Sequence, residues 1–490
     1  MQIRANLLSA SSLRNDTFFY GIATLSERGL SFLIIPLLTK SISQELYGIW
    51  TQIIITAALV SNIILMGFHT AAVRFLAGGN NQQESSNLFH GMLAIVLANS
   101  IIIIILTFLF ASPLSQLVFR DTRFLKFIPL LGFFLVSEAL FELVAAFLRA
   151  HKEIQVLSVY YFVKTAMRIV ILGVGILIFH IGLFQTIIGI VASQLGFILF
   201  IYIKNILKKI GLSLSFGNIH WKTILFFSLP LVPYGILIWA NNFVDRYFIL
   251  HLLDITQVSI YAVAYSLAAI VGLFYSIIGF TLYPYLANLW NNGDKNSAAE
   301  TLHKTIEYYL FFTIPFIALL TVLSSPIIKI FSRVEYLSNW QVVLWLGVGI
   351  GMFGLYQLNI YSILLANKTL LNLEISAVSL FGNILFNMFL IPSVGILGAA
   401  IATFLSNSIL ACWSIQSGKK YLPYLFPWRT TLKIILATCF MSFVLLIAEH
   451  HVEINSVWRL ICLMGVGSGI YGAIDLLNKN SIILGLSKNI

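Results

Sequence analysis

Long apolar runs alternate with short polar segments along almost the whole chain. Runs such as Ser100–Leu109 are apolar on every helix face and lack the alternation typical of membrane β-barrel strands. About 20 apolar residues suffice to cross a bilayer as a helix, which satisfies its own backbone hydrogen bonds. The pattern predicts an all-α polytopic membrane protein with about fourteen transmembrane helices.

The predicted spans are separated by charged or turn residues. They cover residues 17–39, 46–68, 88–110, 127–149, 154–179, 182–203, 224–251, 257–281, 306–326, 340–365, 371–391, 394–416, 430–449 and 457–477. The connection 282–305 is predicted to lie partly on the membrane surface as an amphipathic helix. No connection is long enough to form a separate catalytic domain outside the membrane.

Composition narrows the class of protein further. Of 490 residues, 59% are hydrophobic and 10% charged, whereas soluble domains have about 25% charged residues. This excludes a soluble enzyme and a nucleic-acid-binding domain. With the N-terminus inside, the predicted cytoplasmic segments hold eighteen Lys and Arg residues and the outer segments seven. This positive-inside bias predicts that both termini are cytoplasmic.

The two halves of the chain resemble each other at offsets of 213 to 216 residues. The matching segments are 37–50 with 249–264, 147–153 with 363–369, and 180–194 with 393–407. We therefore expect two six-helix lobes, at 1–210 and 211–420, related by a pseudo-two-fold axis along the membrane normal. Residues 421–490 are expected to add two C-terminal helices.

Eight ionisable residues fall deep within predicted spans, where each is costly and therefore a candidate for function. They are Glu27, Arg28, Glu138, Glu142, Lys164, Arg168, Asp245 and Arg246. We interpret the cations as substrate-binding groups of a lumen and the four acids as candidates for ion coupling or ion pairing.

The spacing of these charges predicts particular contacts. Glu138 and Lys164 are expected at similar depth on two antiparallel helices and should pair. Arg168, one turn deeper, is expected to lack a local partner and to face a water-filled cavity. Alternatively, these charges form a buried network that fixes helix packing. Adjacent residues on a helix point about 100° apart, so Asp245 and Arg246 are not expected to form a self-contained salt bridge.

Other features are less informative about chemistry. Arg74 follows the second predicted span, near the cytoplasmic mouth. It is interpreted either as a group that attracts an anionic headgroup or, equally, as an ordinary positive-inside residue. The sequence contains no GxxxxGK[ST] motif and predicts no cofactor; His450 and His451 are not interpreted as a metal site.

Several segments together resemble the Wzx-type polysaccharide flippases of the multidrug/oligosaccharidyl-lipid/polysaccharide exporter superfamily. They are ERGLSFLIIPLLTKSISQELYGIW, AAVRFLAGG, SLPLVPYGILIWANNFVDRYFI, SIYAVAYSLA and IPSVGILGAAIATFLSNS. The resemblance covers roughly residues 15–415, and within it Arg28, Arg74 and Arg246 match positions in the family's motifs. The two C-terminal helices depart from the twelve-helix pattern of many members.

The resemblance implies a flippase that moves undecaprenyl-diphosphate-linked oligosaccharides, such as O-antigen or exopolysaccharide units, to the outer leaflet of the bacterial inner (plasma) membrane. It implies alternating access through a central cationic cavity. An H⁺ or Na⁺ coupling ion and polysaccharide polymerase or export partners are further expectations. The alternatives are a lipid II-type flippase and a cation-coupled multidrug exporter of the same superfamily.

Overall fold

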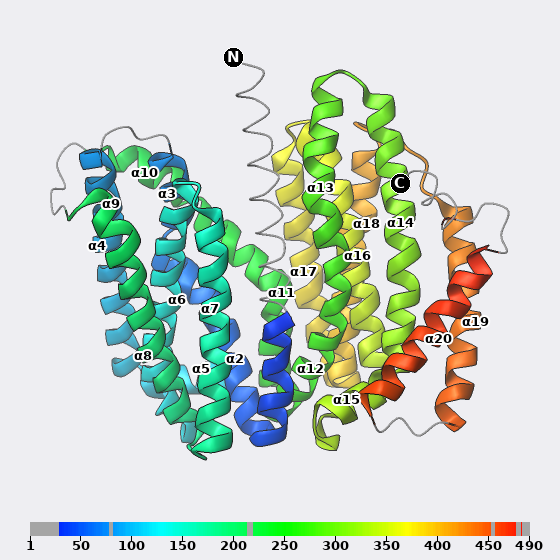
Figure 1. The fold of residues 1–490 in the computed structure, drawn as a ribbon, viewed down its shortest axis with the longest axis horizontal. Coiled ribbons are helices and arrows are strands. Elements are labelled where there is room, and N and C mark those ends of the chain that lie inside the picture. The colour runs from blue at the N-terminus through cyan, green and yellow to red at the C-terminus, as the bar shows by residue number, and fades with distance from the viewer. Residues whose placement is uncertain (1–28, 78–81, 213–218, 452–455, 477–481, 483–490) are drawn as a thin grey trace. The chain divides into compact units, whose positions relative to one another are not determined.

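The computed structural model describes residues 29–77, 82–212, 219–451, 456–476 and 482 (Figure 1). Thirteen helices within these residues are long and apolar enough to span a membrane, and a shorter apolar helix covers Gly29–Ser41. The all-α polytopic architecture is thereby confirmed, and about fourteen spans fit it. Glu27, Arg28 and most of the first predicted span lie outside the described residues.

The chain forms two compact units, Met1–Ala240 and Asn241–Ile490, with the boundary inside helix α11. The predicted lobes and their pseudo-two-fold axis stay predictions. The helices up to the boundary are α2 (Gln44–Leu65), α3 (Phe68–Leu76), α4 (Gln82–Leu109), α5 (Ala111–Phe119), α6 (Phe127–Ala150), α7 (Ile154–Gly173), α8 (Leu183–Ile201), α9 (Lys208–Ile210), α10 (Trp221–Ser228) and α11 (Leu231–Leu252).

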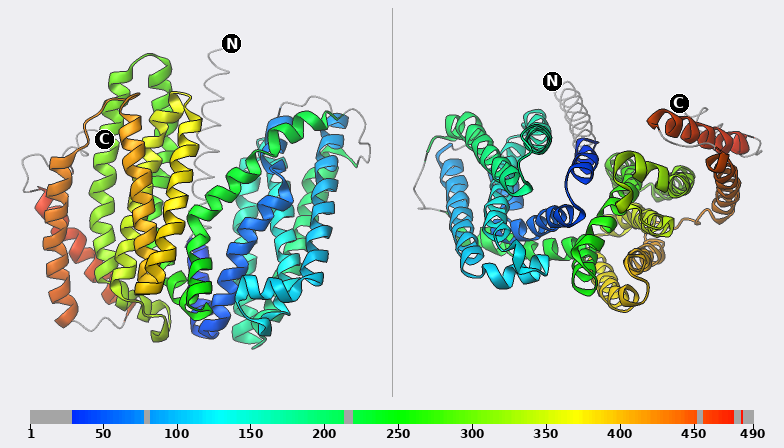
Figure 2. Two further views of the ribbon diagram at one scale, coloured as in Figure 1. Left: turned by 180° about the vertical axis from the view of Figure 1, so that it is seen from behind. Right: turned by 90° about the horizontal axis from the view of Figure 1, so that it is seen from below.

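The second unit continues from α11 to the described end of the chain (Figure 2). Its other helices are α12 (Ile255–Ala268), α13 (Gly272–Asn291), α14 (Lys295–Val322), α15 (Ser324–Phe331), α16 (Trp340–Leu365), α17 (Thr369–Val394), α18 (Ile396–Gly418), α19 (Trp428–His451) and α20 (Val457–Leu476).

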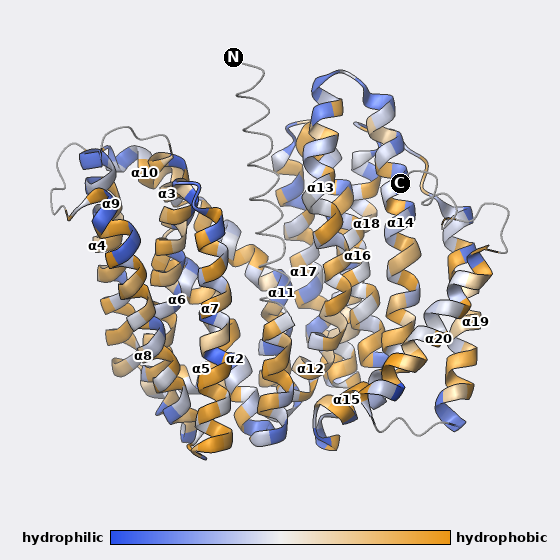
Figure 3. Cartoon of the chain, viewed as in Figure 1, coloured by the Kyte–Doolittle hydropathy of each residue, from blue (hydrophilic) through white to orange (hydrophobic). Residues whose placement is uncertain are grey.

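Helix α6 is the core of the first unit and packs against α2, α3, α4, α7 and α8. It is apolar around most of its circumference, as expected for a helix enclosed by others. Helix α4 instead exposes Ile101, Ile102 and Leu109, which suits contact with lipid (Figure 3). In the second unit, α16 is the central helix and contacts α12, α13, α14 and α18.

Two junctions between helices of the first unit, α2–α3 and α10–α11, pack against each other. Met66 and Gly67 adopt positive φ between α2 and α3, and a Cβ at Gly67 would lie 2.3 Å from the Ser228 carbonyl oxygen. Pro230 lies at the break between α10 and α11. Only glycine allows this close backbone approach, so the contact fixes α3 beside the break.

The predicted surface helix at 282–305 is wrong. Helix α13 continues to Asn291 and α14 begins at Lys295, so the segment forms the ends of two long helices. Gly293 has a φ of 78°, and the Asp294 carboxylate accepts a hydrogen bond from the Ser297 amide at 3.0 Å. A glycine turn followed by an N-cap therefore makes a tight helical hairpin, a signal that the apolar pattern alone obscured.

Candidate functional site: charged clusters and cavities

Glu138 on α6 is the centre of a charged cluster in the first unit. Its Oε2 accepts from the Lys164 ammonium at 3.2 Å, and its Oε1 accepts from the Arg168 guanidinium at 2.5 Å. Gln194 on α8 donates to Oε1 at 3.0 Å. Two helices, α7 and α8, thus supply three donors to one carboxylate on α6, and the predicted Glu138–Lys164 contact is present in the structure.

The expectation that Arg168 lacks a local partner is wrong. Side chains on a helix lean toward its N-terminus, so Arg168 reaches back over the turn that carries Lys164. One carboxylate oxygen of Glu138 then pairs with Lys164 and the other pairs with Arg168. The cluster has the character of the buried network that was the alternative interpretation.

Glu142, one turn along α6, has a different environment. It accepts from the Tyr161 hydroxyl at 3.0 and 3.1 Å and lies 3.4 Å from the Arg149 guanidinium. Its side chain is 32% exposed, against 18% for Glu138. Glu138 is therefore enclosed by cationic donors, whereas Glu142 retains accessible carboxylate surface.

A cavity of about 320 Å³ adjoins both glutamates. It is lined by Ile54, Ala57, Ala58, Ser61, Asn62, Leu65, His69, Phe134, Glu138, Glu142 and Arg168, which come from α2, α3, α6 and α7. Lys164 does not line this cavity; its ammonium lies 4.2 Å from the centre of the Phe141 ring. Arg168 therefore borders this cavity, as expected, whereas Lys164 does not.

Asp245 and Arg246 form a second buried ion pair, in the second unit. The Arg246 guanidinium lies 2.8 Å from Asp245 Oδ1 and donates to the Asn242 carbonyl at 2.6 Å. The Tyr261 hydroxyl donates to Asp245 Oδ2 at 2.6 Å, and the Tyr265 ring lies 4.0 Å from the guanidinium. The expectation that these neighbours do not form a self-contained salt bridge missed their direct contact, because the long arginine side chain folds back across the angle between them. The Asn242 carbonyl and the Tyr261 hydroxyl share that contact.

Arg74 occupies the last turn of α3 and is exposed. Its guanidinium lies 4.4 Å from the centre of the Phe227 ring on α10. No ion pair with a carboxylate is found for Arg74 among the residues that the structure describes. Of the proposed substrate-binding cations in the described ranges, Arg74 is thus the one whose charge is not already matched.

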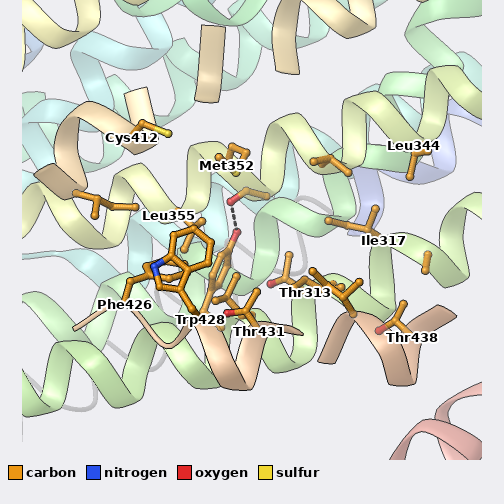
Figure 4. Close-up of a pocket in the computed structure, with 18 of the residues that line it drawn as sticks. Thr313, Ile317, Leu344, Met352, Leu355, Cys412, Phe426, Trp428, Thr431 and Thr438 are labelled. Atoms are coloured by element: carbon orange, nitrogen blue, oxygen red, sulfur yellow. Dashed lines mark hydrogen bonds between the residues drawn. The ribbon is translucent and has the colours of Figure 1, made fainter. Parts of the chain in front are cut away.

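The second unit contains a larger, mainly apolar cavity of about 570 Å³ between α14, α16, α18 and α19. Trp428 and Phe426 lie toward one end and Leu344 toward the other (Figure 4). Gln416 and Lys419 on α18 add polar groups. Along α16 the lining runs from Leu344 to Leu355, roughly 16 Å at the rise of an α-helix. The cavity is elongated and suits a hydrocarbon chain.

The sequence did not reveal the uncharged polar residues that contact the two glutamates or line the cavity beside them. His69, Tyr161 and Gln194 are polar residues within otherwise apolar helices, which is a usable but weak signal. Within the described residues, no group of three or more His, Cys, Asp or Glu side chains could hold a metal ion.

The helical architecture and buried charges define a multi-pass membrane protein of the transporter class. The chain belongs to the polysaccharide biosynthesis protein family, whose sequence model matches residues 13–290, and a MatE model matches residues 230–389. These families and the structural neighbours comprise transporters and flippases rather than enzymes.

Individual proteins show more distant similarity. An uncharacterized membrane protein of Methanocaldococcus jannaschii is 27% identical over 210 residues, 43% of this chain and 41% of that protein. A probable lipid II flippase MurJ of Rhizobium meliloti is 27% identical over 140 residues, 27% of this chain and 26% of that protein. The matches thus span less than half of either relative.

The fold is also similar to a solved structure, a lipid II flippase MurJ in an inward closed conformation. The two chains are 19% identical, with a TM-score of 0.75 over 93% of this chain and 98% of the other. The two chains therefore share the same fold over nearly their whole length.

Proposed function

We propose that the protein moves undecaprenyl-diphosphate-linked oligosaccharides from the inner to the outer leaflet of the bacterial plasma membrane by alternating access. The observation that carries this proposal is a polar cavity bordered by the Glu138–Arg168 ion pair inside an otherwise apolar unit, in a chain of the polysaccharide biosynthesis family. Charged groups at this depth are costly and are retained where they meet a polar cargo.

Such a cargo has a charged diphosphate and an apolar polyprenyl chain, and the described residues include a group suited to each. Arginine binds phosphate through charge-assisted hydrogen bonds, and Arg74 is an exposed arginine without a carboxylate partner among the described residues. The apolar cavity of the second unit suits the polyprenyl chain. A diphosphate cannot enter hydrocarbon unaided, so a protein route is required.

The remaining cations of the proposed substrate-binding set differ from Arg74. Lys164, Arg168 and Arg246 are paired with carboxylates, so each can bind phosphate only by sharing or exchanging its partner. Arg28 belongs to the proposed set from the resemblance. The proposed coupling residues for H⁺ or Na⁺ are Glu27, Glu138, Glu142 and Asp245. We further propose that both termini lie in the cytoplasm and that a polysaccharide polymerase is a partner.

A lipid II-type headgroup is the second candidate cargo, favoured by the fold similarity to the MurJ structure. It shares the polyprenyl diphosphate and differs in the sugars. The multidrug alternative rests on the MatE match to residues 230–389.

Surface polysaccharide measured in a deletion strain complemented with variants tests the proposed function. Arg168→Ala should abolish export at normal membrane levels of the protein, and Arg168→Lys should retain part of it. Lys222→Ala, at an exposed cation of the same unit, is the matched control and should export normally. Normal export by Arg168→Ala would remove Arg168 from the site, and normal export without the protein would refute the proposed function.

A further inference from the structure

We propose that the 320 Å³ cavity of the first unit is a sugar subsite that binds one neutral pyranose ring and disfavours acidic sugars. The inference rests on the proposed function, because it takes the cargo to be a lipid-linked oligosaccharide. Beyond that function, it states that a sugar ring of the cargo is recognised and names the residues that select the ring.

The cavity wall combines hydrogen-bonding groups with an apolar face. Ser61 and Asn62 from α2, His69 from α3 and Glu142 from α6 supply the polar groups. Alanine and leucine side chains of α2 form the apolar part of the wall, backed by the buried Phe134. A pyranose ring has the same division, with hydroxyls around its edge and C–H groups on its faces. The volume lies at the lower end of the range of small-molecule sites.

Several of these polar groups retain bonding capacity. The Asn62 amide nitrogen donates to the Ala58 carbonyl at 2.9 Å, which leaves its side-chain oxygen as an acceptor. Glu142 has two carboxylate oxygens, and Tyr161 and Arg149 do not exhaust their acceptor capacity. His69 Nδ1 is buried without a hydrogen-bond partner among the described residues. An unpaired buried polar atom is costly, so a partner gained through a small side-chain adjustment on binding would be favourable.

The charge balance selects a neutral ring. Glu138 and Glu142 both line the cavity. The neighbouring cations Arg168, Lys164 and Arg149 each already contact one of these two carboxylates. An additional carboxylate, as in a uronic acid, would face Glu142 without a free cation beside it. Like charges brought together in a partly desolvated site repel each other and weaken binding.

Binding to the purified full-length protein in nanodiscs tests the inference. The probes are farnesyl diphosphate and its conjugates with N-acetylglucosamine and glucuronic acid. The N-acetylglucosamine conjugate should bind more than about tenfold more tightly than the glucuronic acid conjugate. Asn62→Ala and His69→Ala should remove its advantage over farnesyl diphosphate, while Thr70→Ala, at an exposed position beside His69, should preserve it. Glu142→Gln should reduce discrimination against the acidic sugar.

The outcomes separate the two proposals. Equal binding of all three probes by the wild type, or an unchanged preference in Asn62→Ala, His69→Ala and Glu142→Gln, would refute the sugar subsite and leave the proposed function standing. Failure of the folded wild type to bind any of the three probes would instead contradict the proposed function. A preference for the glucuronic acid conjugate would overturn the charge argument directly.

Discussion

Glu138 and Arg168 form a 2.5 Å ion pair between α6 and α7, on the wall of a cavity within the first unit. Their side chains are 18% and 17% exposed, so the pair is largely removed from solvent. Lys164 uses the other oxygen of the same carboxylate. Removing the shared acid therefore leaves two cations without their counter-ion, whereas removing one cation leaves the acid paired.

Glu138→Gln should destabilise the protein more than Lys164→Met does. Breaking a buried ion pair from one side costs about 3–5 kcal/mol, because an uncompensated charge remains. The double variant Glu138→Gln with Lys164→Met should recover part of the loss, since one of the stranded charges is gone. Thermal unfolding of the protein in detergent measures all three. Additive losses in the double variant would show that the two side chains do not interact.

Removing one partner of the buried Asp245–Arg246 ion pair in the second unit should likewise destabilise the protein. Both side chains are at most 5% exposed, and Tyr261 and Tyr265 contact them. Asp245→Asn alone should lower the melting temperature strongly, whereas Asp245→Asn with Arg246→Met should lower it less. Export should be lost in the double variant, because Arg246 is a proposed substrate-binding residue. Export at the wild-type level in the double variant would assign the pair a purely structural role.

Filling the apolar cavity of the second unit should weaken binding of long polyprenyl chains. Ala318 lines this cavity on α14, and Ala318→Phe adds a ring where a chain would lie. We expect a loss of about tenfold or more in affinity for undecaprenyl diphosphate and little change for a short-chain analogue. Leu432→Ala, at an exposed lipid-facing position on α19, is the control. Equal affinities for the long chain in all variants would exclude this cavity as the tail site.

Cysteine labelling in intact cells tests the predicted orientation. The three native cysteines are exposed and must first be replaced. Lys40→Cys and Arg333→Cys should react with an impermeant reagent from outside, and Lys209→Cys and Lys420→Cys only after the membrane is opened. The reverse pattern would place both termini outside and overturn the positive-inside argument.

The fold was predictable to a large extent from the sequence, and the charged site only in part. Apolar runs reveal spans because the bilayer requires helices of a given length. The Glu138–Lys164 contact followed from depth alone, since both residues lie at similar distances from one connection. The sharing of Glu138 by Arg168 did not, because it depends on how far a long side chain reaches. His69 and the cavity depend on packing between α2, α3, α6 and α7, which no local pattern encodes.

The central claim is transport of a polyprenyl-diphosphate-linked oligosaccharide, and its most direct test is flipping in proteoliposomes. A fluorescent undecaprenyl-diphosphate oligosaccharide is incorporated, and a membrane-impermeant quencher reports its leaflet. The account predicts that the wild-type protein makes the protected pool accessible, and that Arg74→Ala and Arg168→Ala do so much more slowly. Rates equal to protein-free liposomes for correctly inserted wild-type protein, across H⁺ and Na⁺ gradients of either direction, would contradict it.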